Sequence, residues 1–595
     1  MRCLISILTT VPAFPAKIRM FLKMKVNLMN LTIVIMVLLF FCGCSLERKA
    51  SPLNERQAKD TGSGSVESGN SYYYFMEAQI NRKNGDLDRA ILYLHKAIQK
   101  DPESSYLKLE LAIAYLQQKD NKKAIDIIEK IVKKEPENIR ALILYGKLKQ
   151  TLKEIDDAEQ TYEKIIALDP RQRNIYLLLG NLYMQEKKFD QALAVFQKLV
   201  HHFPASYAGH FFIGKIYADQ KNTKGAEKEF KKALELNSDL EEPRYELIKL
   251  YEAEGKKEAI IRLYKDILDK DPQNIKAAME LGYLYYKEGK SRNAEKIFKE
   301  LGVRSVDQTE VLRTLVYLYL DKKQYGATIV ILKGMLKGAS KSSDLHYIAG
   351  VAYDGKKDWE KAIAHFKRVT NGSKFYQEAV VHIAFLYQEH NKIGEAIEYL
   401  KGVIQHNPGN SEFLLYLGSL YEEKEEFEKA ENVLQKGIKI DDSNPRLHFR
   451  IGVVYDKWGK KKASIAEMKT VIRLEPKNVN ALNYLGYTYA EMGKHLDEAE
   501  RLVKEALKEK PNDGYITDSL GWVYFKKGLY DKAVKYLEKA VALVPDDPII
   551  LEHMGDAYFK ISEKEKALQF YKRSLSKKKK DKESLEKKIQ ELTGK

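Results

Sequence analysis

The three cysteines carry the most reactive side chains of the sequence, and their positions limit the thiol chemistry open to the chain. Cys3, Cys42 and Cys44 all lie within or at the end of a hydrophobic N-terminal segment, and the rest of the chain has none. A disulfide framework or a thiolate metal site is therefore excluded from the long segment that follows.

The histidines and the remaining polar residues do not suggest catalysis either. The twelve histidines are scattered without metal-ligand spacing, and the adjacent pair His201 and His202 would point to different faces of a helix. No phosphate-binding glycine loop and no nucleophile elbow is present in the sequence. We expect no enzyme activity, no catalytic residue, no metal site and no cofactor.

The N-terminus has the composition of an export signal. Lys17, Arg19, Lys23 and Lys25 precede an apolar run over residues 31–41. That run is shorter than the roughly 20 apolar residues that a membrane-spanning helix needs. A basic segment, a short apolar segment and a small residue before the boundary are typical of a secretory signal.

The boundary Phe41-Cys42-Gly43-Cys44 resembles the bacterial lipobox, although Phe41 replaces the usual Leu and Cys42 is an unusual small residue. The resemblance implies a signal peptide over 1–43, possible translation from Met24, and lipidation of Cys44. Ser45 after that cysteine implies release to the outer membrane, with the protein facing the periplasm, where several acyl chains make stable anchoring. The alternative is an uncleaved anchor that ends at Cys44.

Residues 44–70 are polar and end in Gly and Ser, which predicts a flexible tether. The net charge is +17, and five of the positive charges precede the predicted cleavage site. The other lysines are spread over the chain, as on solvated helix faces, or they attract anionic partners such as peptidoglycan, lipid headgroups or acidic peptides. The export signal argues against nucleic acid.

Residues 71–581, which hold most of the remaining polar residues, consist of one unit that is repeated along the chain. A small residue recurs every 34 residues, Tyr follows three positions later, Ala twelve positions later and Pro twenty-four positions later. One inserted residue near His495 shifts the frame. We call the small residue the rung. The rungs are Ala78, Ala112, Gly146, Gly180, Gly214, Gly282, Gly350, Ala384, Gly418, Gly452, Gly486, Gly521 and Gly555.

Apolar residues at helical spacing within each unit predict two amphipathic helices, A and B. The rung allows helix A to approach helix B closely, the Ala serves the same contact from helix B, and the Tyr bridges one unit to the next with its hydroxyl near solvent. Pro ends helix B and suits the first turn of the next helix. A single pair cannot bury its apolar face, so the units must stack.

This pattern resembles the tetratricopeptide repeat in period and in residue order. The resemblance implies an all-α fold, a right-handed α-solenoid of about fifteen helix pairs. From 275 to 376 the units lack the closing proline, and Ile248 and Val316 replace two small rungs. This region is either a flex region or drift in a tolerant scaffold. Residues 582–595 are predicted to form a polar capping helix.

In tetratricopeptide proteins ligands lie in a groove lined by helix A, and the residue after each rung points there by resemblance. Two sets of groove residues are candidates for binding peptides. The first is a basic stripe of Lys147, Asn181, Lys215 and Lys249 that suits a carboxylate or an acidic peptide. The second combines amides with aromatic rings, which suit an extended peptide: Asn480, Asn483, Tyr487, Tyr515, Trp522 and Phe525. The alternative for both sets is a solvated groove.

The segments NALNYLG at 480–486 and DSLGW at 518–522 are similar to outer-membrane tetratricopeptide lipoproteins that act as adaptors of periplasmic carboxyl-terminal processing proteases. This similarity implies a scaffold that binds protein or peptide partners in the periplasm, contacts the membrane through its lipid anchor and brings substrates to a protease. The alternative is an assembly or export factor for exopolysaccharide, pili or outer-membrane proteins. The sequence leaves the oligomeric state open.

Overall fold

The computed structural model describes residues 70–578 and 582–594. These residues form α-helices and one π-helix, η1, arranged as fifteen helix pairs followed by a single helix, α33. The chain divides into two compact units at Ser340 and Lys341, which we call the N-terminal and C-terminal units. The predicted signal peptide, Cys44 and the predicted tether up to residue 69 lie outside the described residues.

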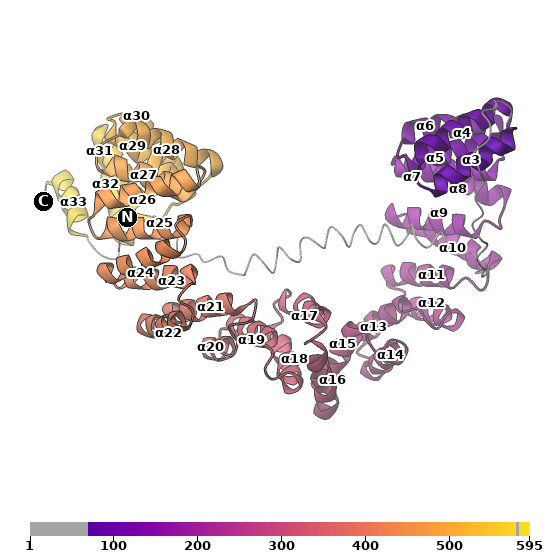
Figure 1. Ribbon diagram of the computed structural model, residues 1–595, viewed down its shortest axis with the longest axis horizontal. Coiled ribbons are helices and arrows are strands. Elements are labelled where there is room, and N and C mark those ends of the chain that lie inside the picture. The colour runs from indigo at the N-terminus through magenta and orange to yellow at the C-terminus, as the bar shows by residue number, and fades with distance from the viewer. Residues whose placement is uncertain (1–69, 579–581, 595) are drawn as a thin grey trace, which may run out of the picture. The chain divides into compact units, whose positions relative to one another are not determined.

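Consecutive helix pairs follow one another in chain order within each unit, with odd-numbered A helices and even-numbered B helices (Figure 1). The N-terminal unit contains α3 (Ser71–Lys83), α4 (Leu87–Lys100), α5 (Ser105–Gln117), α6 (Asn121–Lys134), α7 (Ile139–Thr151), α8 (Ile155–Leu168), α9 (Arg173–Gln185), α10 (Phe189–His202), α11 (Tyr207–Asp219), α12 (Thr223–Leu236), α13 (Glu242–Glu254), α14 (Lys257–Lys270), α15 (Ile275–Lys287), α16 (Ser291–Arg304), α17 (Thr309–Leu315), η1 (Val316–Leu320) and α18 (Tyr325–Gly338).

The C-terminal unit repeats this order and ends with the unpaired helix. It contains α19 (Ser343–Gly355), α20 (Trp359–Phe366), α21 (Tyr376–Glu389), α22 (Ile393–His406), α23 (Ser411–Glu423), α24 (Phe427–Ile440), α25 (Pro445–Lys457), α26 (Lys461–Leu474), α27 (Val479–Glu491), α28 (Leu496–Glu509), α29 (Gly514–Lys526), α30 (Tyr530–Leu543), α31 (Pro548–Lys560), α32 (Lys564–Lys577) and α33 (Glu583–Thr593).

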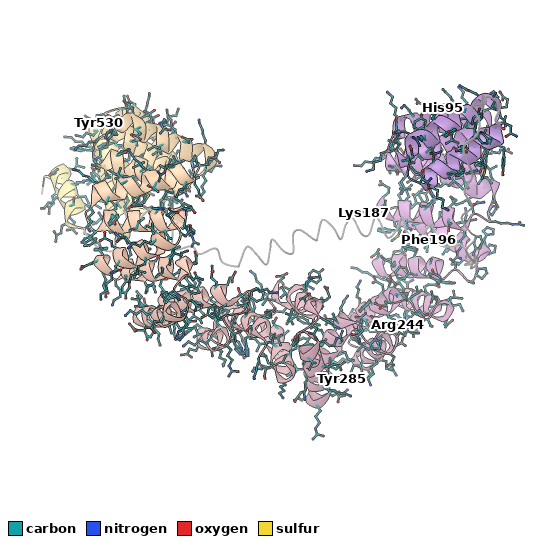
Figure 2. The ribbon with its side chains drawn as sticks, in the orientation of Figure 1. His95, Lys187, Phe196, Arg244, Tyr285 and Tyr530 are labelled. Carbon is teal, nitrogen blue, oxygen red and sulfur yellow. The ribbon has the colours of Figure 1, made fainter. Side chains whose placement is uncertain are left out.

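The rung glycines set the distance between the two helices of a pair. A Cβ atom on Gly180 would collide with the ring of Phe196 on α10, a residue labelled in Figure 2. A Cβ atom on Gly214 would lie 2.7 Å from Phe230 on α12. Ala192, on the facing side of α10, is fully buried. The rung therefore lets a large side chain of helix B reach the backbone of helix A, which is the close approach that the sequence predicted.

The tyrosine three positions after the rung joins one pair to the next through its hydroxyl group. Tyr183 Oη donates to Glu163 of α8 at 2.7 Å, and Tyr558 Oη donates to Glu538 of α30 at 2.8 Å. The ring packs between neighbouring pairs, and its polar end is held by the B helix of the preceding pair. These hydrogen bonds add direction to an otherwise apolar stacking interface.

The prolines that close the units lie in the connecting turns. Pro102, for example, follows the C-cap Asp101 of α4 and precedes Ser104, the N-cap of α5, whose hydroxyl accepts the Leu107 N–H. The expectation that these prolines begin the next helix is therefore wrong for this position: Ser104 and its hydroxyl begin α5. The proline ends helix B because it has no N–H to donate.

The turn between helices A and B holds a residue in the left-handed conformation in each pair, and the turn with the inserted residue holds two. Glycine occupies this position in some pairs, as at Gly528 with φ of 75°, and lysine occupies it in others, as at Lys187 with φ of 58° (Figure 2). Near the inserted residue, both Gly493 and His495 have positive φ. The insertion is thus absorbed in the turn before α28, and the repeat continues unchanged after it.

The middle pairs depart from the regular geometry. The A helix of the pair whose rung is Val316 is split into α17 and η1. Its B helix, α18, crosses α16 at backbone contact, since a Cβ on Gly302 would collide with the Met335 carbonyl oxygen. The boundary between the two units also falls within residues 275–376. The flex region itself stays a prediction.

Candidate functional site

The A helices of the C-terminal unit are joined by acidic side chains. Glu422 of α23 accepts from Arg450 of α25 at 2.9 Å, and Asp456 of α25 accepts from Tyr484 of α27 at 2.8 Å. Asp518 of α29 lies 3.0 Å from His553 of α31. In these three contacts a carboxylate of one A helix meets a donor on the next A helix. Paired in this way, the buried carboxylates fix neighbouring helices relative to each other.

Trp522 is the centre of the predicted amide and aromatic set, and its own neighbours cover it. Only 7% of its surface is exposed, its Nε1–H donates to Glu491, and its ring stacks on Phe525 at 4.6 Å between centroids. His553 stacks on the other side at 3.9 Å, and Tyr487 lies 6.3 Å from His553. The structure brings Tyr487, Trp522 and Phe525 together around a histidine that the sequence did not single out.

The environment of His553 stabilises its charged form. Burial lowers the pKa of the imidazole, but the carboxylate of Asp518, together with Asp556 and Glu491, outweighs burial and raises the pKa above its usual value. The protonated ring is therefore a buried cation held against Asp518.

The other residues of the same set differ in how far they are exposed to solvent. Asn483 is 2% exposed, and its Oδ1 accepts no hydrogen bond from any described residue. Asn480 and Tyr515 are partly exposed. Asn480 and Tyr515 are thus partly accessible to solvent, whereas Asn483 and Trp522 are buried. The peptide-binding role of the set stays a prediction.

The predicted basic stripe occupies equivalent positions on α7, α9, α11 and α13. Lys147 and Lys249 are exposed, and Asn181 and Lys215 are partly exposed. Lys249 Nζ forms a salt bridge with Glu246 at 3.0 Å, and Lys215 Nζ lies 5.9 Å from the centre of the Phe211 ring. The four residues share one face, but Glu246 reduces the net charge at its Lys249 end. Binding of a carboxylate there also stays a prediction.

A third set, which the sequence analysis did not select, contains exposed aromatic side chains. We call Tyr283, Tyr286 and Tyr317 the tyrosine patch. Tyr317 is 59% exposed and Tyr286 is 48% exposed. The rings of Tyr283 and Tyr286 stack at 6.3 Å, and Tyr283 meets Tyr319 of η1 edge to face at 5.7 Å. The available signal was tyrosine directly after the rung in two successive units.

Lysines flank the tyrosine patch. Lys287 Nζ lies 4.7 Å from the centre of the Tyr283 ring, and Lys322 Nζ lies 5.9 Å from that of Tyr317. Exposed aromatic rings beside cations offer apolar contact area and a positive edge to a partner. This combination suits an extended protein segment that carries aromatic or acidic side chains.

Tyr317 of this patch lies in the π-helix η1. In η1 the Asp321 N–H donates to the Val316 carbonyl at 2.9 Å, five residues back in the chain. Val316, which stands where most units have a small rung, is the first residue of η1. Single π turns inside α-helices occur frequently at functional sites.

The structure offers no metal chemistry within residues 70–578 and 582–594: no three His, Cys, Asp or Glu side chains there are grouped to hold an ion. Across the same residues, every helix is too short or too polar to cross a bilayer.

Comparison with solved structures finds similar chains. The Cut9–Hcn1 hetero-tetramer of the APC/C is 16% identical, with 82% of this chain and 96% of that chain covered and a TM-score of 0.36. A tetratricopeptide repeat protein from Parabacteroides merdae ATCC 43184 is 19% identical over 42% of this chain and 99% of that chain, with a TM-score of 0.36. MamA is 29% identical over 27% of this chain and 95% of that chain, with a TM-score of 0.25. No curated protein matches.

Family models for the tetratricopeptide repeat match more than half of the chain. The matches span residues 82–148 and 387–448, 146–200 and 177–241, 445–478, and 484–586. They fall on the helix pairs described above, whose fold is generally a non-catalytic scaffold for protein–protein interaction. This chain belongs to the tetratricopeptide-repeat family.

Proposed function

We propose that this chain is a non-catalytic scaffold of the bacterial cell envelope that holds extended segments of partner proteins on its A-helix face. The observation that carries the proposal is the tyrosine patch, in which Tyr286 and Tyr317 are about half exposed. Lys287 lies over the ring of Tyr283, and Lys322 lies over that of Tyr317. Aromatic residues dominate the binding energy of many protein interfaces because they bury a large area with few rotatable bonds.

The proposed location rests on the N-terminal sequence. The order of basic residues, apolar run and Cys44 supports a lipid anchor on that cysteine and an outer-membrane lipoprotein that faces the periplasm. The polar segment after Cys44 would then connect the membrane to α3. A scaffold held in this way meets partners at a raised local concentration.

The finer role that we propose is that of an adaptor for a periplasmic protease. The support is the similarity of segments 480–486 and 518–522 to such adaptors. An adaptor needs no chemistry of its own, since holding protease and substrate on one scaffold raises their effective concentration.

The test is crosslinked capture from intact envelopes with three versions of the full chain: wild type, a double variant Tyr286→Ala, Tyr317→Ala, and a control Val303→Ala, Val306→Ala. The control residues are also exposed apolar residues, at 55% and 66%, but Val303 belongs to helix B and Val306 to the turn that follows it. We expect wild type and control to retain the same partners and the tyrosine variant to lose them.

The identity of the captured proteins separates the finer roles. A protease together with cell-wall hydrolases supports the adaptor. Capture of components of exopolysaccharide, pilus or outer-membrane assembly would replace the adaptor role with that of an assembly or export factor. The chain would still be a protein-binding scaffold. Equal capture by all three versions would contradict the tyrosine patch as the binding surface.

A further inference from the structure

The first helix of the array exposes an apolar stripe. Tyr72, Tyr73, Met76 and Ile80 of α3 are 67%, 42%, 40% and 50% exposed. At 100° per residue these four side chains lie within about 100° of arc on one side of the helix. On its other side, α3 packs normally: Phe75 meets Tyr106 of α5 edge to face at 5.6 Å. We call the four exposed residues the α3 stripe.

The repeat shows what this surface does in the following pairs. Tyr73 and Ile80 correspond, 34 residues on, to Leu107 and Ala114 of α5, and both of these are buried. The next equivalents, Ala141 with Leu148 on α7 and Ile175 with Leu182 on α9, are buried as well. In those pairs the two positions stack on the preceding helix pair. Tyr73 and Ile80 therefore occupy stacking positions that stay exposed on α3, with Tyr72 and Met76 exposed beside them.

The opposite end of the array is closed. Leu585 of α33 is fully buried, and Lys588 donates to Asp556 of α31 at 2.7 Å and to Glu552 at 3.0 Å. Lys578 pairs with Glu552 at 2.9 Å. A polar helix thus covers the last pair in the way expected of a terminal cap. Another copy of the chain finds no open stacking surface at this end.

We propose that the α3 stripe pairs with the α3 stripe of a second copy, forming a two-fold symmetric dimer through the N-terminal ends. A head-to-tail contact is disfavoured because α33 closes the other end, so the same surface must serve both copies, which makes a closed C2 dimer. The sequence over 45–69, which directly precedes α3, contains only scattered apolar residues and offers no stripe of its own.

The size of the stripe sets the strength of the contact. The exposed part of the four side chains amounts to on the order of 400 Å², the range in which surface apolar patches mark interaction sites. That is about half of the area per partner in a standard stable complex. The dimer is accordingly a reversible one that forms at micromolar concentration, independent of any partner on the A-helix face.

Sedimentation velocity of the full chain in detergent, over concentrations of about 1–100 μM, tests this pairing. The variant is Ile80→Glu and the matched control is Ile440→Glu, which places the same charge on an isoleucine of α24 that is 45% exposed. We expect wild type and Ile440→Glu to dimerise with the same dissociation constant and Ile80→Glu to raise it at least tenfold. Unchanged circular dichroism and melting temperature show that the variant is folded.

Two results would overturn the proposal. One is a wild-type chain that stays monomeric over the whole range, which would leave the stripe to another segment or protein. The other is an Ile80→Glu chain that dimerises as wild type does, which would place the contact elsewhere. A second variant, Met76→Lys, tests the centre of the α3 stripe and should raise the dissociation constant of the dimer in the same way.

Discussion

The rings of Trp522 and His553 stack with their centroids 3.9 Å apart and an angle of 13° between their planes. His553 also lies 3.0 Å from the carboxylate of Asp518, so one buried imidazole joins α29 to α31 by stacking and by charge. An aromatic residue that the sequence placed in a ligand groove is thus part of the connection between two repeats.

This connection predicts a pH-dependent stability of α29 and α31. Because Asp518 outweighs burial and raises the pKa of His553, the stabilisation is complete below the unfolded pKa of about 6.5 and is lost as the pH rises through the raised folded pKa. We expect amide exchange in these helices, corrected for intrinsic rates, to show less protection at high pH. The variant His553→Gln should lower the protection at acidic pH and remove the pH dependence. Retention of the wild-type pH dependence in the variant would assign it to another group.

Replacing glycine by alanine should have opposite effects on stability at a rung glycine and at a helix glycine that faces open space. Gly180→Ala drives a methyl group into Phe196, and overpacking of this kind costs about 1–3 kcal/mol of unfolding free energy. Gly402→Ala, in α22, meets open space and should stabilise by up to about 1 kcal/mol through helix propensity. Equilibrium urea unfolding of both variants measures the difference. Equal effects would mean that the rung does not set the distance between helices A and B.

Loss of the Glu110 carboxylate should destabilise the first helix pairs. Its buried carboxylate binds Arg140 and lies 2.7 Å from Arg82, and these partners, with Gln79, outweigh burial and lower its pKa. Glu110→Gln leaves both guanidinium groups without their carboxylate, which costs about 2 kcal/mol. The glutamate's contribution is present above the unfolded pKa and is lost as the pH falls through the lowered one.

Local amide exchange in α3, α5 and α7 measures this loss. The control is Glu103→Gln, which removes an exposed carboxylate that pairs with Lys134. Exposed ion pairs contribute little, so the control should not change exchange measurably. A similar loss in both variants would mean that burial of Glu110 has no special role.

The fold could be predicted from the sequence because the repeat pattern depends on contacts between residues that are close together in the chain. The small rung and the tyrosine three positions later each have a direct packing partner at a fixed distance along the chain, as Gly180 has in Phe196 and Tyr183 has in Glu163. The helix pairs and their stacking were predictable for this reason. The π-helix at Val316 was not, because a large residue at the rung does not by itself mark a π turn: Ile248 also replaces a small rung, and α13 is a regular helix.

The candidate site was less predictable, and two residues show why. Trp522 and Tyr317 occupy the same position after the rung, yet Trp522 is 7% exposed and Tyr317 is 59% exposed. The difference comes from neighbours: Phe525 and His553 stack against the ring of Trp522, whereas the ring of Tyr317 stays exposed. Periodicity tells which face a residue lies on, but the side chains of adjacent pairs decide whether that face is open.

The central claim is that partner proteins bind the A-helix face at the tyrosine patch. The most direct measurement is photo-crosslinking in living cells, with a photoreactive phenylalanine analogue at Tyr317 or, as the control, at Val303 on the B helix α16. These two sites are 59% and 55% exposed, so access to solvent is matched. We predict discrete protein adducts from position 317 and none from position 303. The absence of adducts at 317, or the same adducts from both positions, would contradict the account.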